Sequence, residues 1–188
     1  MSIVELSRVL IRLANSQDRQ EIVRLEKLAV KNLCQNIYDE RQIDTVTERI
    51  EHLRFNDEIV FVAEQNDNLV GFVSLLSYRK ILRTLYVRQN LQDKGIGARL
   101  LKAIEQEAVK QKISTLKVTS SLAERSFYNA QGYQEIAFCQ LGKMDLLIPC
   151  IAMQKRLNNS FRLQGKLSFL LKMITAIAPN ALFFLLAL

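Results

Sequence analysis

The first third of the chain has an apolar pattern that changes from a strand period to a helical period. Residues 8–13 predict a short strand, and residues 15–34 predict a helix, because Asn15 and Ser16 suit the position just before a helix. Apolar residues recur along one face of this predicted helix: Ile22, Leu25, Ala29 and Leu33. A second helix is predicted over residues 39–53.

Residues 59–88 then follow a strand pattern. Apolar segments over 59–64, 69–78 and 81–88 predict three consecutive strands, and Asn66-Asp67-Asn68 predicts a turn between the first two. Gly71 lies inside the second strand, where a glycine indicates a bulge or the close approach of another backbone. These strands therefore form a meander.

The third strand leads through a polar connection into a helix that begins near Gly95-Ile96-Gly97. Its apolar residues recur every fourth position: Ile96, Leu100, Ile104 and Ala108, with Leu101 beside them. Further elements follow in the order strand (114–119), helix (122–130) and two strands (133–140 and 146–153). Pro149 in the last strand indicates an irregularity or a sheet edge.

Composition narrows the class of protein. The chain has 188 residues, enough for one domain with a full core, and 49% hydrophobic with 24% charged residues indicates a globular protein. Of the net charge of +7, Arg162, Lys166 and Lys172 contribute +3 in a tail without acidic residues, which leaves +4 for the rest. That balance suits an anionic cofactor, and no basic stripe with interleaved aromatics indicates nucleic acid.

Cysteine and histidine usage adds two expectations. Cys34, Cys139 and Cys150 are odd in number and widely spaced, which predicts buried thiols in a reducing compartment rather than disulfides or metal ligands. The single histidine, His52, cannot assemble a zinc site, so no metal is expected. Charged residues interrupt the apolar runs at the N-terminus, so no signal peptide is predicted and a cytoplasmic protein is expected.

The glycine-bearing turn suits an anion. The first amides of a helix have no partner inside it, the helix dipole is positive there, and glycine lets an anion approach the backbone. On its own, Gly95-x-Gly97 more often indicates a tight turn with a helix cap than a phosphate site. The dinucleotide fingerprint needs a third glycine where Leu100 stands, and the P-loop pattern is absent.

Two longer motifs carry a family resemblance. Residues 85–97, Leu-Tyr-Val-Arg-Gln-Asn-Leu-Gln-Asp-Lys-Gly-Ile-Gly, resemble the acetyl-CoA motif of the GNAT N-acetyltransferase superfamily, a strand ending in Val, then Arg/Gln-x-x-Gly-x-Gly/Ala and a helix. Residues 121–133 resemble the family's helix that ends Phe-Tyr-x-x-x-Gly-Phe. The two motifs stand in the family's order, and the resemblance covers about Leu6 to Leu157.

The resemblance implies an α/β (α+β) fold with a mixed, mostly antiparallel sheet of six to seven strands. This sheet is splayed between its fourth and fifth strands, and helices cover both faces. Acetyl-CoA would lie in the gap, with its pantetheine arm along the open edge of residues 81–88. The implied cofactor-binding residues are Leu85, Tyr86, Val87, Gln92, Asp93, Lys94, Gly95, Ile96, Gly97, Ala98 and Ser121.

Acetyl transfer to an amine needs placement of both reactants, oxyanion stabilisation and proton transfers. Tyr128 matches the family's tyrosine that protonates the departing thiolate, and a phenol with a pKa near 10 suits that role. Without the family motif, Tyr128 would be interpreted as a packing aromatic beside Phe127. Glu124 departs from the family pattern, which has a small residue there, and Gln89 replaces a common proline.

The general base and the acceptor site are less defined. Glu64 could reach the cleft through water, so it is a candidate base. Acidic residues and His52 in the early helices fall where the family forms its acceptor wall, although a solvated surface is the alternative. The acceptor-site candidates are Tyr38, Asp44 and Tyr78.

Residues 158–188 form an extension beyond the predicted domain of residues 1–157. Met173 to Leu188 carry no charge, but these sixteen residues fall short of the roughly 20 that a spanning helix needs, and Pro179 interrupts them. The pattern predicts an amphipathic helix on the domain, on a second subunit of a homodimer or on a membrane surface.

We therefore predict a cytoplasmic, acetyl-CoA-dependent N-acetyltransferase. It would act by direct transfer in a ternary complex on a primary amine of a small molecule or peptide. The alternative is a non-catalytic acyl-CoA-binding sensor module, with the tail as its oligomerisation or membrane contact.

Overall fold

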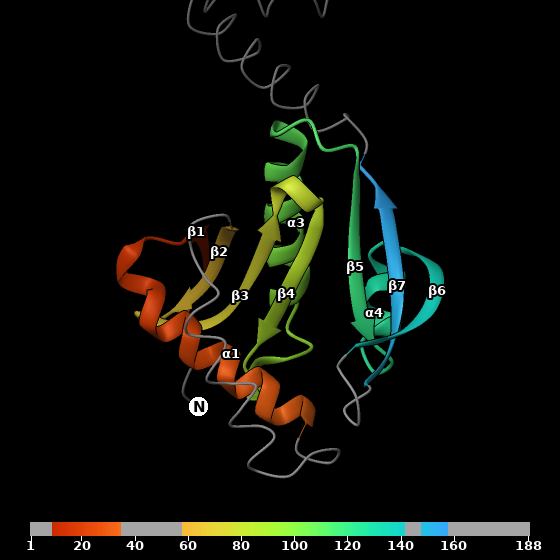
Figure 1. The fold of residues 1–188 in the computed structure, drawn as a ribbon. Helices are drawn as coiled ribbons and strands as arrows, with labels where there is room; N and C mark the ends of the chain where they lie inside the picture. Colours follow the sequence, from red (N-terminus) through yellow and green to blue (C-terminus); the bar gives the residue numbers. More distant parts are fainter. Residues whose placement is uncertain (1–8, 35–57, 142–147, 158–188) are drawn as a thin grey trace, which may run out of the picture.

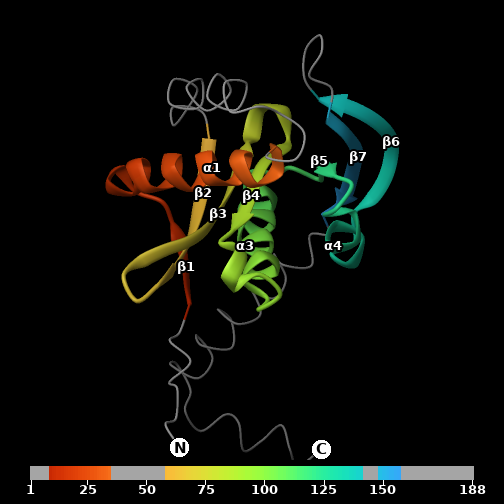
Figure 2. The ribbon, with the colours of Figure 1, turned by 90° about the horizontal axis from the view of Figure 1, so that it is seen from below.

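The computed structural model describes residues 9–34, 58–141 and 148–157. These residues form a seven-stranded sheet, with α1 on one face and α3 and α4 on the other (Figures 1 and 2). The strands are β1 (Leu10–Leu13), β2 (Glu58–Gln65), β3 (Asn68–Leu76), β4 (Ile81–Val87), β5 (Thr115–Ser121), β6 (Gln134–Leu141) and β7 (Ile148–Arg156). The helices are α1 (Arg19–Cys34), α3 (Ile96–Lys110) and α4 (Arg125–Ala130), with short 3-10 turns η1 (Ser16–Asp18), η2 (Ser77–Arg79) and η3 (Gln89–Leu91). The helix predicted over 39–53 and the tail lie outside the described residues.

The sheet opens between β4 and β5. The strand order is β1-β2-β3-β4-β5-β7-β6, and β4 and β5 are the one parallel pair among these strands. Their ladder holds Ile81 opposite Lys117 and Leu82 opposite Val118, after which the strands diverge (Figure 1). Among the described strands, β5 therefore pairs with none of residues 83–87 of β4, and the predicted splay is confirmed.

Gly71 of β3 has both features that a glycine inside a strand indicates, a bulge and the close approach of another backbone. The β2–β3 ladder pairs Ala63 with Gly71 and then Glu64 with Leu69, so a bulge lies beside the glycine. A Cβ atom on Gly71 would also lie 2.6 Å from the carbonyl oxygen of Tyr86 in β4. Both expectations for this position are confirmed.

We expect Gly71→Ala to destabilise the fold by about 1–3 kcal/mol, because the added methyl meets rigid backbone rather than a side chain that can move. Gly97→Ala is the matched control, since its Cβ would meet the Phe127 ring at an ordinary 3.5 Å. Urea unfolding of both variants measures the difference. Equal losses of unfolding free energy would contradict the clash.

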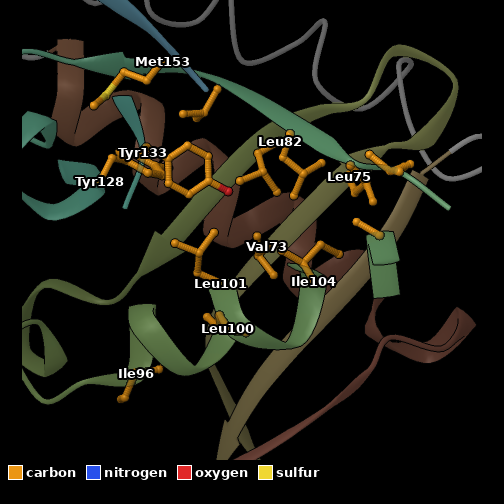
Figure 3. Packing of buried hydrophobic residues seen from close by; sticks show 14 of the residues in the cluster. Val73, Leu75, Leu82, Ile96, Leu100, Leu101, Ile104, Tyr128, Tyr133 and Met153 are labelled. Carbon is orange, nitrogen blue, oxygen red and sulfur yellow. The ribbon is translucent and has the colours of Figure 1, made fainter. Parts of the chain in front are cut away.

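Apolar residues pack on both faces of the sheet. The stripe predicted for α3 is buried mainly against β2, β3 and β4. The predicted α1 residues Ile22 and Leu25 pack on Val60, Val62 and Phe72 on the opposite face. Figure 3 shows Leu100, Leu101 and Ile104 of α3 in the larger cluster. The buried positions of α3 are Ile96, Leu100, Leu101, Ile104, Ala108 and Val109, together with Glu105.

The start of the first helical segment is fixed by a capping box. The Asn15 side chain accepts from the Gln17 amide at 2.8 Å, and Asp18 accepts from the Asn15 amide at 2.7 Å. Arg12 of β1 donates to both oxygens of Asp18 at 2.7 and 2.9 Å. The side-chain hydrogen bond from Arg12 is the main reason that the pKa of Asp18 is lowered. The predicted cap at residues 15–16 is confirmed.

We expect Asp18→Asn to remove the pH-dependent contribution of the Asp18 carboxylate to the free energy of unfolding. A lowered folded-state pKa contributes stability above the unfolded value near 3.9, and this contribution disappears as pH falls through the folded pKa. The variant should be less stable by about 1–2 kcal/mol at pH 7, and this difference should shrink as the pH falls below about 3.9. Urea unfolding between pH 2 and pH 7 measures this difference, with the exposed Asp67→Asn as the control variant. A difference in unfolding free energy that does not change with pH would contradict the prediction.

Two elements differ from the sequence prediction. The helix predicted from Leu122 begins at Arg125, because the Ser121 hydroxyl accepts from the Glu124 amide at 3.3 Å and holds the intervening residues in a turn. The last strand lies inside the sheet, between β5 and β6. Pro149 nevertheless sits at a local edge, because the β5–β7 ladder ends at the Ser121–Cys150 pair. Within the described ranges, no helix is long and apolar enough to cross a membrane.

Candidate functional site

The turn between β4 and α3 presents uncapped helix amides. Gly95 is the N-cap residue of α3 with φ 74°, a left-handed conformation that favours glycine, and no side chain caps the helix at this position. The first hydrogen bond of the helix runs from the Arg99 amide to the Gly95 carbonyl at 3.1 Å. The amides of residues 96–98 therefore have no acceptor within the helix, and they suit an anion such as a diphosphate.

Arg88 anchors the strand end from which this turn starts. Its amide donates to the Val70 carbonyl at 2.8 Å, and its Nε donates to the Leu69 carbonyl at 3.0 Å. Its guanidinium also pairs with Glu21 of α1 at 2.9 Å. Three contacts to two different elements thus fix the position of the turn relative to the sheet.

A cavity of 440 Å³ lies between the open part of β4, the glycine turn and α4. Apolar side chains of β4 form one wall, the turn forms the second, and α4 with the residues before it forms the third. The lining residues are Leu85, Val87, Leu91, Gln92, Asp93, Gly95, Gly97, Ala98, Ala123, Glu124, Ser126, Phe127, Tyr128 and Gln131. An elongated molecule with an anionic end fits these walls, because its apolar arm would face β4 and its charge would face the α3 amides.

Tyr128 is the buried polar residue of the third wall. It is 4% exposed, and its ring packs edge-on against Phe127, with ring centroids 5.1 Å apart. Burial, followed by the negative charge of Glu124, raises the pKa of Tyr128 above its ordinary value. The phenol is therefore protonated at neutral pH and can donate a hydrogen bond.

A partly buried ion pair lies beside Tyr133, the residue that packs against Tyr128. The ring of Tyr133 lies 5.5 Å from that of Tyr128, and the Lys155 ammonium lies 5.6 Å from the Tyr133 ring centroid (Figure 3 shows both tyrosines). Lys155 of β7 pairs with Glu105 of α3 at 2.8 Å. This pair joins the helix of the glycine turn to the other half of the splayed sheet.

Glu124 places a carboxylate at the rim of the cavity. Its side chain accepts a hydrogen bond from the Ser121 hydroxyl at 3.1 Å. Although the residue is exposed, the protein atoms around the carboxylate raise its pKa by desolvation, and the hydrogen bonds from Ser121 partly offset this effect. Ser121 thus acts on the cavity through Glu124 and does not line it.

Residues 17–157 match the family model described as the acetyltransferase (GNAT) domain. The chain belongs to the GNAT acetyltransferase family. This match confirms the family predicted from the two motifs, and with it the N-acetyltransferase class and acetyl-CoA as the acetyl donor. A search of curated proteins gave no match.

Solved structures share the fold of this GNAT chain. The GCN5-related N-acetyltransferase from Rhodopseudomonas palustris is 20% identical with a TM-score of 0.69, and the match covers 83% of this chain and 100% of that one. A GNAT-family acetyltransferase from Staphylococcus aureus is 21% identical, with a TM-score of 0.61 and coverage of 80% and 100%. The PaiA N-acetyltransferase from Thermoplasma acidophilum, solved with coenzyme A, is 20% identical, with a TM-score of 0.60 and coverage of 79% and 99%.

The GNAT fold brings most of the predicted cofactor residues together. Seven of them line the cavity with Tyr128: Leu85, Val87, Gln92, Asp93, Gly95, Gly97 and Ala98. Tyr86 instead faces α1 and packs near Phe72, with ring centroids 6.4 Å apart. The Lys94 side chain is exposed, and the Ile96 side chain is buried in the core, so Ile96 offers only its amide to the cavity.

The residues predicted for the base and the acceptor lie elsewhere. Glu64 does not line the cavity and pairs with Arg12 at 2.6 Å near the β1 edge of the sheet. Tyr78 is 66% exposed in η2, at the opposite end of β4 from the glycine turn. Tyr38 and Asp44 lie outside the described residues. The roles of these four residues remain predictions.

Sequence reasoning missed a buried polar cluster beside the middle of β4. Glu26 of α1 is 5% exposed; it lies 3.4 Å from the Thr84 hydroxyl and 3.8 Å from the Arg83 guanidinium. Arg83 also donates to Glu58 at 2.7 Å. A signal was present, because Glu26 stands four residues after Ile22, within the apolar stripe of the helix.

Proposed function

We propose that this GNAT chain transfers the acetyl group of acetyl-CoA directly to a primary amine of a small molecule or peptide, with both reactants bound together. The observation that carries the proposal is the 440 Å³ cavity, which combines the open edge of β4, the uncapped start of α3 and a buried tyrosine. The sensor alternative shares the first two features but has no use for a protonated phenol at the inner wall.

In this proposal, the α3 amides bind the charged end of the cofactor and the open edge of β4 binds its pantetheine arm. The amides of residues 96–98 would hold the diphosphate, because they lack acceptors within the helix and lie at its positive end. The pantetheine arm would lie against Leu85 and Val87 and hydrogen-bond with the backbone that the splay leaves open. The thioester would then lie along β4.

The chemistry at the thioester follows from this placement. A neutral amine attacks the acetyl carbon, a C–N bond forms, and the carbonyl oxygen gains negative charge that backbone N–H groups of β4 can stabilise. The C–S bond then breaks and the sulfur leaves as a thiolate, while the nitrogen releases a proton. Tyr128 is protonated when the C–S bond breaks and donates a hydrogen bond to the departing sulfur. When its proton passes to the thiolate, the phenolate is reprotonated by the proton that the nitrogen released, so the enzyme ends unchanged.

The amine must lose its proton before it attacks, and the base is proposed from position. Glu64 is held by Arg12, so it would act only through water. Glu26 lies beside Thr84 on the α1 face of β4, and its carboxylate is a second candidate. Comparing Glu26→Gln with Glu64→Gln across pH separates them, because loss of the base shifts the rate profile toward higher pH.

The test is a panel of primary amines incubated with the purified full chain and acetyl-CoA, with release of coenzyme A thiol as the readout. We expect amine-dependent thiol release with at least one acceptor, and a reaction without amine corrects for hydrolysis. Tight coenzyme A binding with no release for any amine would overturn the enzyme and support the sensor module.

The role of residues 158–188 belongs to the same proposal. We propose that this apolar extension beyond residue 157 contacts a second subunit or a membrane surface. Light scattering of the full chain and flotation with anionic vesicles distinguish these partners. A monomer that does not float with vesicles would contradict both.

A further inference from the structure

Cys139 of β6 and Cys150 of β7 lie directly opposite each other. They are Cα partners in the antiparallel ladder, and their sulfur atoms are 2.8 Å apart. Neither forms a disulfide in the structure. Opposed residues of antiparallel strands have Cα atoms about 4.5–5.5 Å apart, which falls inside the range of about 4.4–6.8 Å that a disulfide spans. No backbone movement is needed to join them.

The two thiols differ in access. Cys150 is 2% exposed in the interior strand β7, whereas Cys139 is half-buried in β6, which forms the outer edge of the sheet (Figure 1). An oxidant therefore reaches Cys139 first, and Cys150 stands behind it. A partly accessible thiol beside a protected one is the arrangement of an oxidisable cysteine with its resolving partner.

We propose that Cys139 and Cys150 are a modification site, a dithiol that a hydroperoxide converts to an intramolecular disulfide. The Cys139 thiolate attacks the peroxide: an S–O bond forms, the O–O bond breaks, and water leaves after taking up a proton. The Cys150 thiol then gives up its proton and attacks the Cys139 sulfur, so that the S–S bond forms, the S–O bond breaks and a second water leaves. Two thiols and one hydrogen peroxide give one disulfide and two waters.

A metal is the other ligand that paired cysteines suggest, but the surroundings do not support one. Among the described residues, no group of three or more His, Cys, Asp or Glu side chains is placed to hold a metal ion. Neither cysteine lines the 440 Å³ cavity, so the oxidation itself uses no residue of the acetyl-transfer site. The pair nevertheless lies near the third wall, because Cys150 is opposite Ser121, which holds Glu124.

The test uses the full chain, which has three cysteines, treated with hydrogen peroxide under native conditions and then alkylated. Two of the three thiols should be lost, and dithiothreitol should restore them. Trypsin cleavage after Arg125, Lys143 and Lys155 places the two cysteines in different peptides, 126–143 and 144–155. These peptides should travel as one cross-linked species in a non-reduced digest.

Two variants separate the pair from other thiol chemistry. Cys34→Ser should keep the cross-linked species, since the third cysteine takes no part. Cys150→Ser should lose it and instead accumulate a sulfenic acid on Cys139, which dimedone traps. Disulfide-linked dimers through Cys34, or sulfinic acid on Cys139 in the wild type without the cross-linked peptides, would overturn the proposal.

Discussion

Replacing Tyr128 by Phe should reduce kcat for acetyl transfer about 10²–10³-fold while leaving the Kd for coenzyme A within about twofold. The change removes one oxygen from a wall of the cavity and leaves the ring packing against Phe127 and Tyr133 in place. The lost hydrogen bond acts on the departing sulfur, which carries full charge only late in the reaction. Steady-state kinetics together with calorimetric binding of coenzyme A measure the two quantities.

Tyr133→Phe is the matched control for this experiment. Tyr133 is 2% exposed and packs edge-on against Tyr128, but it does not line the cavity, and the Glu105 carboxylate lies beside its hydroxyl. Removal of that hydroxyl leaves the cavity wall unchanged, so turnover should stay within about threefold of wild type. Equal losses in the two variants would show that packing, rather than the Tyr128 hydroxyl, supports the rate.

Gly95→Asp should weaken coenzyme A binding about tenfold or more relative to Gly95→Asn. Space is available at this position, because a Cβ atom on Gly95 would have no heavy atom within 4 Å. Asn and Asp both tolerate the left-handed conformation at φ 74°, so strain is shared by the two variants. The added negative charge of Asp alone repels the diphosphate and attracts the α3 amides that would hold it.

The Gly95 comparison isolates charge from geometry. Calorimetry at two salt concentrations should show the gap between the Asp and Asn variants narrowing as salt rises, because screening weakens interactions between exposed charges. In urea unfolding the Asp variant should be no less stable than the Asn variant, because its charge lies at the positive end of α3. Identical affinities would mean that the diphosphate lies away from the start of α3.

Local sequence patterns predicted the parts of the fold that depend on local physics. The α3 stripe from Ile96 to Ala108, the cap at Asn15 and the hairpin turn at Asn66 and Asp67, both with positive φ, are all as expected. The bulge and the close backbone approach at Gly71 could be predicted because glycine weakens a strand and is found there mainly at such sites. The splay between β4 and β5 came from the resemblance, since no local pattern encodes how far two strands stay paired.

The remainder depends on contacts between distant segments. The Cys139–Cys150 pair exists because of the β6–β7 register, which a bulge near Ile136 shifts by one residue. The Lys155–Glu105 pair needs β7 to lie in the interior of the sheet, where the sequence gives no sign of its neighbour. The later start of α4 results from one serine hydroxyl that competes with the helix for the Glu124 amide.

Because the β4–β5 ladder is short, the sheet consists of two subsheets, β1–β4 and β5–β7, that are joined over a short length. Two registered pairs join them, and the Lys155–Glu105 bridge spans the opening on the α3 side. A ligand bound in that opening would contact both subsheets at once and would stabilise their relative orientation. We therefore expect coenzyme A to slow hydrogen exchange of β5 and β7 as well as that of the glycine turn. The reason is that binding reduces the opening motions of the β5–β7 subsheet relative to β4.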